Sequence, residues 1–129
     1  MTTLTNITPL GFHAIVDCAN CDPGAIQNET TIRAWLEKTV SLVTGTAVGT
    51  PVVASTGTDT EGLAVLQLLD IGYISAKFVN SKNHAYIDIF SMKEILIADV
   101  ETATRSYFGA DVVTNKALIP RNAEAIPPQ

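Results

Sequence analysis

The chain has 129 residues, of which 47% are hydrophobic and 16% are charged. A chain of this length buries about two-thirds of its unfolded surface, which suits one domain and excludes two ordinary ones. The net charge of −5 and the scattered Lys and Arg residues argue against nucleic-acid and membrane-surface binders, which carry basic patches. No apolar run approaches the ~20 residues of a membrane span and no signal peptide is recognisable, so the cytoplasm is the expected location.

Six short strands are indicated by continuous or alternating apolar residues. They are expected at 12–17, 52–56, 63–70, 74–79, 85–90 and 110–114. Two amphipathic helices are predicted where apolar residues recur every three or four positions. The first follows the N-cap Asn28 and ends before Gly45. The second starts at Glu94 or Ile97, behind a capping box at Ser91–Glu94.

The order β-α-β-β-β-β-α-β predicts an α+β fold, an antiparallel sheet with helices packed on one face. Residues 11–118 are expected to form the single domain, preceded by a flexible N-terminus at 1–10. The segment 119–129 holds three prolines and is predicted to be an unpacked tail.

Several motifs in shared order and spacing resemble the prokaryotic S-adenosylmethionine decarboxylase proenzymes. Gly11-Phe12-His13, Asp17 and Cys21-Asp22 are similar to the opening motif of that family. Residues 85–91, Ala-Tyr-Ile-Asp-Ile-Phe-Ser, resemble its Ala-x-Ile-Asp-x-Phe-Thr segment. The resemblance covers residues 11–113 and implies the family's α/β sandwich. It also implies a homodimer or higher homo-oligomer, because family members pair and the apolar run at 63–69 needs cover on both faces.

The resemblance implies a specific chemistry. Family members cut their own chain at a Glu-Ser bond, and the Ser becomes a pyruvoyl group. The pyruvoyl carbonyl forms a Schiff base with the substrate amine and accepts electrons during loss of CO₂. A His soon after the Ser supports processing, and a Cys after the Phe-Thr segment donates a proton in turnover.

This chain departs from the family at each of those positions. The Glu-Ser-His motif falls on Ile71-Gly72-Tyr73, the second His on Lys77 and the Cys on Met92. Gly72 has no side chain, so it can neither attack a carbonyl nor become a pyruvoyl group. Ser75, the nearest hydroxyl, would shift the register by three and would still lack a partner His or Cys. We therefore expect no pyruvoyl cofactor and no self-cleavage.

Other residues near these positions are candidates for a ligand site. Tyr73 and Lys77 share one face of their strand and are the catalytic candidates, since a Lys in an apolar cleft can act as a base. The loop residues Asp59 and Glu61 could meet a cationic ligand. The alternatives are a solvated Lys and a solvated turn. The ligand-binding candidates are Asp59, Glu61, Gly72, Tyr73, Lys77 and Met92.

Cys18-Ala19-Asn20-Cys21 is a C-x-x-C sequence, which fits either a redox pair or two structural thiols. We favour structural thiols, because Cys21 matches a common family position. A zinc site would need two more ligands, and His13 and His84 are single and distant in sequence, so no metal site is expected. A buried structural hydrogen bond is the expected role of His13.

Two functions from different classes follow. The first is a pseudoenzyme that binds a partner, such as an active decarboxylase, or an S-adenosylmethionine-like ligand. The second is a repurposed cofactor-free enzyme that degrades S-adenosylmethionine and releases methylthioadenosine. In the second, Tyr73, Lys77 and the loop with Asp59 and Glu61 would orient the sulfonium and supply a base. Neither hypothesis involves nucleic acid or a membrane.

Overall fold

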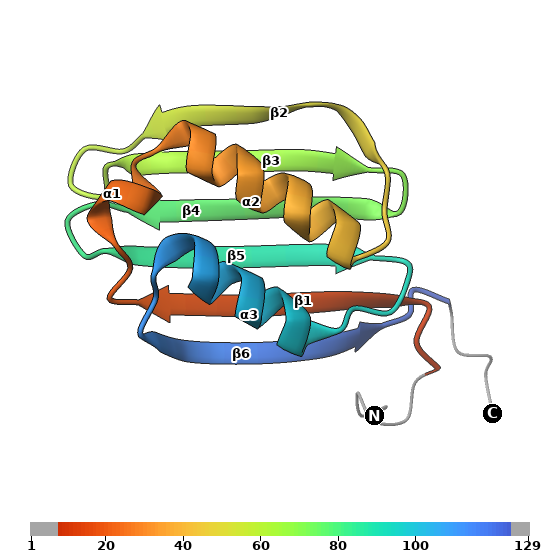
Figure 1. Ribbon diagram of the computed structural model, residues 1–129. Helices are drawn as coiled ribbons and strands as arrows, with labels where there is room; N and C mark the ends of the chain where they lie inside the picture. The colour runs from red at the N-terminus through yellow and green to blue at the C-terminus, as the bar shows by residue number, and fades with distance from the viewer. Residues whose placement is uncertain (1–7, 125–129) are drawn as a thin grey trace.

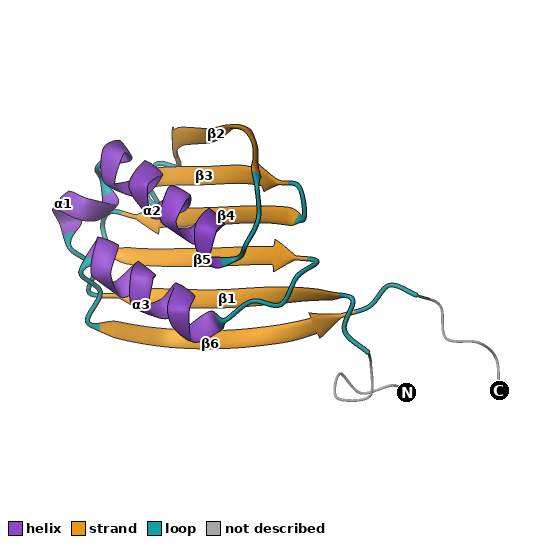
Figure 2. Cartoon of the chain, turned by 45° about the vertical axis from the view of Figure 1, so that its right-hand side comes forward, coloured by secondary structure: helices purple, strands orange, loops and turns teal. Residues whose placement is uncertain are grey.

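The computed structural model describes residues 8–124, which form one six-stranded antiparallel sheet with three helices on one face (Figures 1 and 2). The strand order is β2-β3-β4-β5-β1-β6. The strands are β1 (Gly11–Ala19), β2 (Ala47–Thr56), β3 (Gly62–Leu69), β4 (Gly72–Val79), β5 (His84–Ser91) and β6 (Val112–Arg121). The helices are α1 (Pro23–Ile26), α2 (Glu29–Leu42) and α3 (Ile97–Phe108). The predicted α+β fold is confirmed. Within the described residues, no helix is long and apolar enough to cross a membrane.

The core lies between the sheet and the two long helices. Phe108 of α3 packs between Trp35 of α2 and Phe78 of β4, with ring centroids 5.4 Å and 5.0 Å away. The Trp35 indole Nε1 donates a hydrogen bond to Thr104 Oγ1 at 3.1 Å, and both residues are fully buried. This bond satisfies the one polar group of the indole and joins α2 to α3.

The period of two in β4 determines which side chains face the helices. Ile74, Ala76 and Phe78 are buried beneath the helices, whereas the side chains between them point to the opposite face. We call that opposite side the bare face, because no described helix or strand covers it (Figure 2).

The helix α3 starts at the second of the two predicted positions, but without the predicted cap. The helix begins at Ile97 after Leu96, which makes no side-chain cap hydrogen bond. Ser91 is the last residue of β5 and is buried, and its Oγ accepts from the backbone N–H of Lys93 instead. The expected capping box at Ser91–Glu94 is therefore wrong, because the chain is still paired in the sheet at Ser91.

The last strand is much longer than expected. β6 continues to Arg121 and pairs with β1 along its whole length, with Ile119 opposite His13 and Arg121 opposite Gly11. Residues 119–121 thus belong to the sheet, and the expected domain boundary at 118 and unpacked tail from 119 are wrong there. Pro120 is tolerated because β6 is an edge strand. Residues 1–7 and 125–129 of the two expected flexible segments lie outside the described part.

Both cysteines are buried and unbridged. Burial raises the pKa of the Cys18 thiol to about 12, with a smaller contribution from the neighbouring Cys21. Burial also raises the pKa of Cys21 to about 11. Thiols that resist ionisation are poor nucleophiles, which supports the structural interpretation over a redox pair.

We predict that alkylation by iodoacetamide at mildly alkaline pH is at least ~100-fold slower in the folded protein than in denaturant, because burial suppresses the reactive thiolate. Quenched samples analysed by mass spectrometry give the two rates. Equal rates in the folded and denatured states would contradict the buried placement of Cys18 and Cys21.

Candidate functional site

The aromatic end of the bare face is built by three neighbouring strands. Strand pairing places Tyr73 of β4 beside Phe90 of β5 and Phe90 beside His13 of β1. The Tyr73 and Phe90 rings stack with centroids 5.8 Å apart. Tyr73 is 42% exposed, so this pair offers an accessible aromatic surface.

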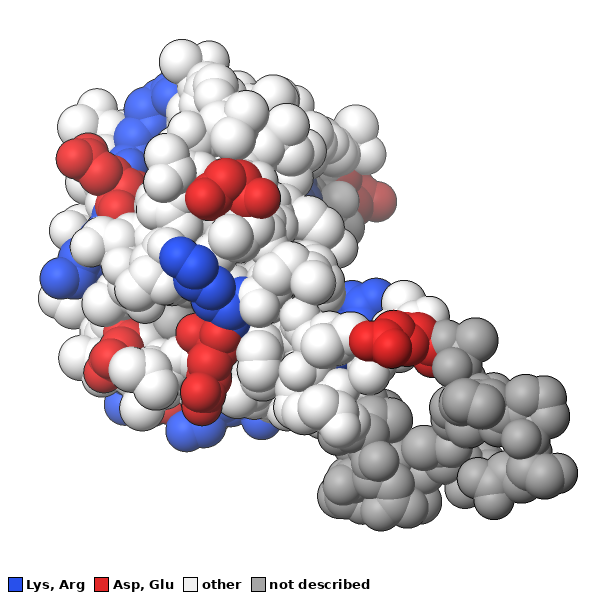
Figure 3. All heavy atoms as spheres, turned by 90° about the vertical axis from the view of Figure 1, so that its right-hand side faces the viewer, with Lys and Arg blue, Asp and Glu red and all other residues white. Residues whose placement is uncertain are grey.

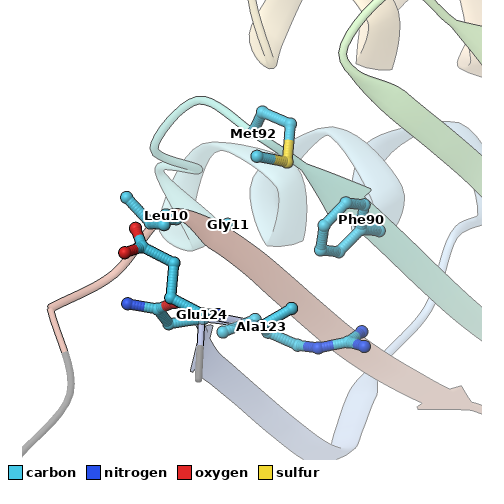
Figure 4. A pocket seen from close by; sticks show the side chains of 8 residues that line it. Leu10, Gly11, Phe90, Met92, Ala123 and Glu124 are labelled. Carbon is cyan, nitrogen blue, oxygen red and sulfur yellow. The ribbon is translucent and has the colours of Figure 1, made fainter. Parts of the chain in front are cut away.

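A cavity of about 460 Å³ opens beside Phe90, at the end of the sheet where β1 begins and β6 ends (Figure 4). This volume lies within the range of small-molecule sites. Met92, Leu10 and the Phe90 ring surround it, and the carboxylate of Glu124 lies beside Leu10 (Figure 4). The remaining lining residues are Gly11, Arg121, Asn122 and Ala123.

Gly11 makes room for the Phe90 ring. A Cβ at Gly11 would lie 2.8 Å from the Cζ of Phe90, so the ring occupies the space that a side chain would fill. Arg121, opposite Gly11 on β6, lies over the same ring with its guanidinium carbon 5.1 Å from the ring centroid. This distance is that of a cation–π contact. The missing side chain at Gly11 thus allows two strands to contribute to one site.

Gly72 is in equally close contact with β5. A Cβ at this position would lie 1.9 Å from the carbonyl oxygen of Phe90. The backbone of β5 therefore fills the space where any other residue would begin its side chain. The neighbouring pairing is regular, since the Met92 N–H donates to the Ile71 carbonyl at 2.8 Å. A serine at this position would therefore require the backbones of β4 and β5 to move apart.

The six predicted ligand-binding residues separate into two groups. Gly72, Tyr73 and Met92 lie at the cavity end of the sheet, although the cavity lining includes only Met92. Lys77 lies four residues along β4 from Tyr73, which corresponds to roughly 13 Å. The structure does not bring these two groups together.

Lys77 is used within the fold. Its Nζ donates to Thr56 O at 3.1 Å, Thr56 Oγ1 at 2.7 Å and Gly62 O at 3.2 Å. It thereby links β4 to the end of β2 and to the start of β3. These three oxygen acceptors engage the donors of the ammonium within the fold, so Lys77 is not directed at a ligand.

Asp59 and Glu61 lie in that hairpin and are exposed. The Glu61 carbonyl accepts from the Asn80 N–H at 2.9 Å, which joins the loop to the β4–β5 turn at the end of the sheet away from the cavity. This placement agrees with a solvated turn rather than with a part of the cavity.

His13 makes its hydrogen bond on the bare face. Its Nε2 lies 3.1 Å from Asp88 Oδ1 across the β1–β5 pair. The His13 side chain is 25% exposed, so the expected bond is present but is only partly buried. No cluster of three or more His, Cys, Asp or Glu residues within 8–124 could hold a metal ion.

Arg121 and Glu124 are site residues that the sequence did not reveal. They lie in the segment predicted to be an unpacked tail, and only the long pairing of β6 with β1 brings them to the cavity. Figure 3 shows this end of the molecule, where charged side chains of both signs are interspersed on a largely uncharged surface. On the part of this end that the structure describes, no basic patch of the kind used to bind nucleic acid forms.

Comparisons with known proteins agree with this architecture. The profile of the S-adenosylmethionine decarboxylase family matches residues 12–120. The crystal structure of the adenosylmethionine decarboxylase from Aquifex aeolicus VF5 is similar with a TM-score of 0.74 and 18% sequence identity. That match covers 95% of this chain and 100% of the other, and at this identity it shows the fold alone. No curated protein matches the chain. Because the family profile spans most of its length, the chain belongs to the S-adenosylmethionine decarboxylase family.

Proposed function

We propose that this protein neither cleaves itself nor decarboxylates, and that it binds an S-adenosylmethionine-like ligand in the cavity beside Phe90. The observation that carries the proposal is the contact at Gly72, where the Phe90 carbonyl fills the volume that a Cβ would need. The resemblance places the family's pyruvoyl precursor at Gly72, which has neither a hydroxyl nor room for one. Lys77 and Met92 likewise replace the His and Cys on which the family chemistry depends.

The ligand class follows from the aromatic surface and the cavity. A sulfonium is a cation, and cations bind favourably over aromatic rings such as Phe90 and Tyr73. A purine base can stack on the same rings. The cavity of about 460 Å³ is large enough for a small molecule that carries both groups.

Degradation of S-adenosylmethionine is the second candidate function. It is supported by Tyr73, whose exposed ring lies at the cavity end of the sheet. Within residues 8–124 the Tyr73 hydroxyl has no hydrogen-bond partner, so it is free to meet a ligand. This function is weakened by Lys77, which bonds to the β2–β3 hairpin, and by the distance of Asp59 and Glu61 from the cavity. Any such reaction would depend mainly on orientation of the sulfonium.

We also propose that a second copy of the chain covers the bare face, in the cytoplasm, where two unbridged cysteines remain reduced. Strand pairing places five apolar side chains together on β2, β3 and β4, and each is at least 40% exposed. This bare-face patch consists of Val48, Val52, Leu66, Leu68 and Tyr73. Contiguous exposed apolar surface of this kind marks an interface, and symmetric dimers are its commonest form. An active decarboxylase of the same family is the alternative occupant.

Replacing Gly72 by Ser tests the carrying observation. We expect Gly72→Ser to remain uncleaved and to lose about 2 kcal/mol of stability or more, because the new Cβ meets the β5 backbone. Thermal unfolding and intact mass measure the two effects. Gly24→Ser is the matched control, because a Cβ there would meet nothing closer than 3.7 Å. A Gly72→Ser protein that is as stable as the wild type and cuts itself would contradict the proposal.

Thermal shift with S-adenosylmethionine tests the ligand. We expect a ligand concentration of ten times Kd to raise the unfolding temperature by roughly 5 °C. Phe90→Leu should remove most of this shift, whereas Tyr86→Leu, on the same strand and face but at the far end, should retain it. Recovery of the unchanged ligand supports binding alone, and release of methylthioadenosine supports the degrading enzyme. Absence of any shift would reject the cavity as the ligand site.

Light scattering tests the dimer. The wild-type chain should have twice the mass of one 13.7 kDa chain, and Leu68→Lys should convert it to a monomer by placing a charge in the patch that the dimer would bury. Leu118→Lys is the control, since Leu118 is similarly exposed but lies on β6 outside the patch. A monomeric wild type, or a Leu68→Lys dimer, would contradict this assignment.

A further inference from the structure

Two opposite charges on the cavity lining are not paired with each other. Arg121 and Glu124 both line the cavity. The ion pairs formed within residues 8–124 are His13–Asp88, Arg33–Glu29, Arg105–Glu101 and Lys116–Glu101. In that part of the chain, the Arg121 guanidinium contacts the Phe90 ring, and neither it nor the Glu124 carboxylate has an ionic partner.

The backbone holds these two charged residues in place. Arg121 ends β6 opposite Gly11, and its carbonyl accepts from the Leu10 N–H at 2.9 Å. Asn122 then fixes the following turn, since its Nδ2 donates to Thr8 O at 2.9 Å and its Oδ1 accepts from the Glu124 N–H at 2.7 Å. The side chain of Asn122 therefore determines where Glu124 leaves the backbone.

The two charges lie on different sides of the cavity. The guanidinium of Arg121 lies against the Phe90 ring. Glu124 also lines the cavity, and in the view of Figure 4 its carboxylate lies toward Leu10 and away from Phe90. A ligand that satisfies both must therefore carry an anionic and a cationic group.

We infer that this cavity recognises the α-amino-carboxylate group of its ligand, with Arg121 pairing the carboxylate and Glu124 the ammonium. The inference rests on the proposed ligand site and names the part of the ligand that gives specificity. A guanidinium binds a carboxylate through two parallel hydrogen bonds, and charge-assisted bonds of this kind are the strong ones. Phe90 already contacts Arg121, so the exposed ring of Tyr73 is the aromatic surface that remains for the sulfonium or the base.

This arrangement has a consequence for reactivity. Loss of CO₂ breaks the bond between Cα and the carboxylate carbon, and the electron pair of that bond must be taken up by the rest of the molecule. A cation that holds the carboxylate stabilises the charged ground state and does not favour that movement. A site built around Arg121 retains the acid and should discriminate against ligands that have already lost it.

Calorimetric titration of the full chain with four probes tests the inference. The probes are S-adenosylmethionine, its thioether analogue S-adenosylhomocysteine, decarboxylated S-adenosylmethionine and methylthioadenosine, which lacks the amino acid. The wild type should bind the first two roughly 10- to 100-fold more tightly than the two that lack the carboxylate. Equal affinity for all four would overturn the inference and leave the ligand site standing. No binding of any probe would overturn both.

Variants assign the effect to the two charges. Arg121→Met keeps an unbranched side chain over Phe90 and should lose at least ~10-fold in affinity for S-adenosylmethionine with little change for methylthioadenosine. Glu124→Gln should weaken only probes that carry the ammonium. Arg33→Met, at an exposed ion pair on α2, is the control and should match the wild type. Unchanged affinity ratios in Arg121→Met would contradict the assignment.

Discussion

At Gly72, strands β4 and β5 approach so closely that the carbonyl oxygen of Phe90 occupies the volume a Cβ would need. Phe90 has a second glycine on its other side, because its ring fills the space above Gly11 of β1. The position of Phe90 thus depends on the absence of a side chain at both Gly72 and Gly11. Its backbone excludes the hydroxyl residue of the family chemistry, and its ring provides an aromatic wall of the cavity. In the function proposed above, the absence of the reaction and the binding of a ligand both follow from this local packing.

The polar groups at the two ends of the sheet have different roles. At the hairpin end, Lys77 bonds to oxygens of Thr56 and Gly62 and stabilises the connection of three strands. At the cavity end, Arg121 and Glu124 lie on the lining of a largely apolar cavity without an ionic partner within residues 8–124. Charges satisfied by the fold contribute to stability, whereas charges left for solvent or ligand determine what binds. The charged groups available to a ligand therefore lie at the end of β6 and not at Lys77.

The local sequence predicted the order of the six strands and the faces of β4, but not the full length of β2 and β6 or the strand partners. The alternation in β4 correctly places Ile74 and Phe78 in the core and Tyr73 and Lys77 opposite. It cannot tell that Lys77 meets the β2–β3 hairpin, because that depends on pairing between distant strands. The prolines after 118 indicated a tail, yet an edge strand accommodates Pro120 and pairs residues more than a hundred positions apart. The site residues Arg121 and Glu124 were missed for that reason.

The intact mass of the purified wild-type chain, measured after incubation with carboxyl-labelled S-adenosylmethionine, tests the central claim most directly. The account predicts one uncleaved species of 13.7 kDa and no labelled CO₂ above the protein-free rate. Two fragments, with a blocked amino terminus on the C-terminal one and release of labelled CO₂, would contradict it.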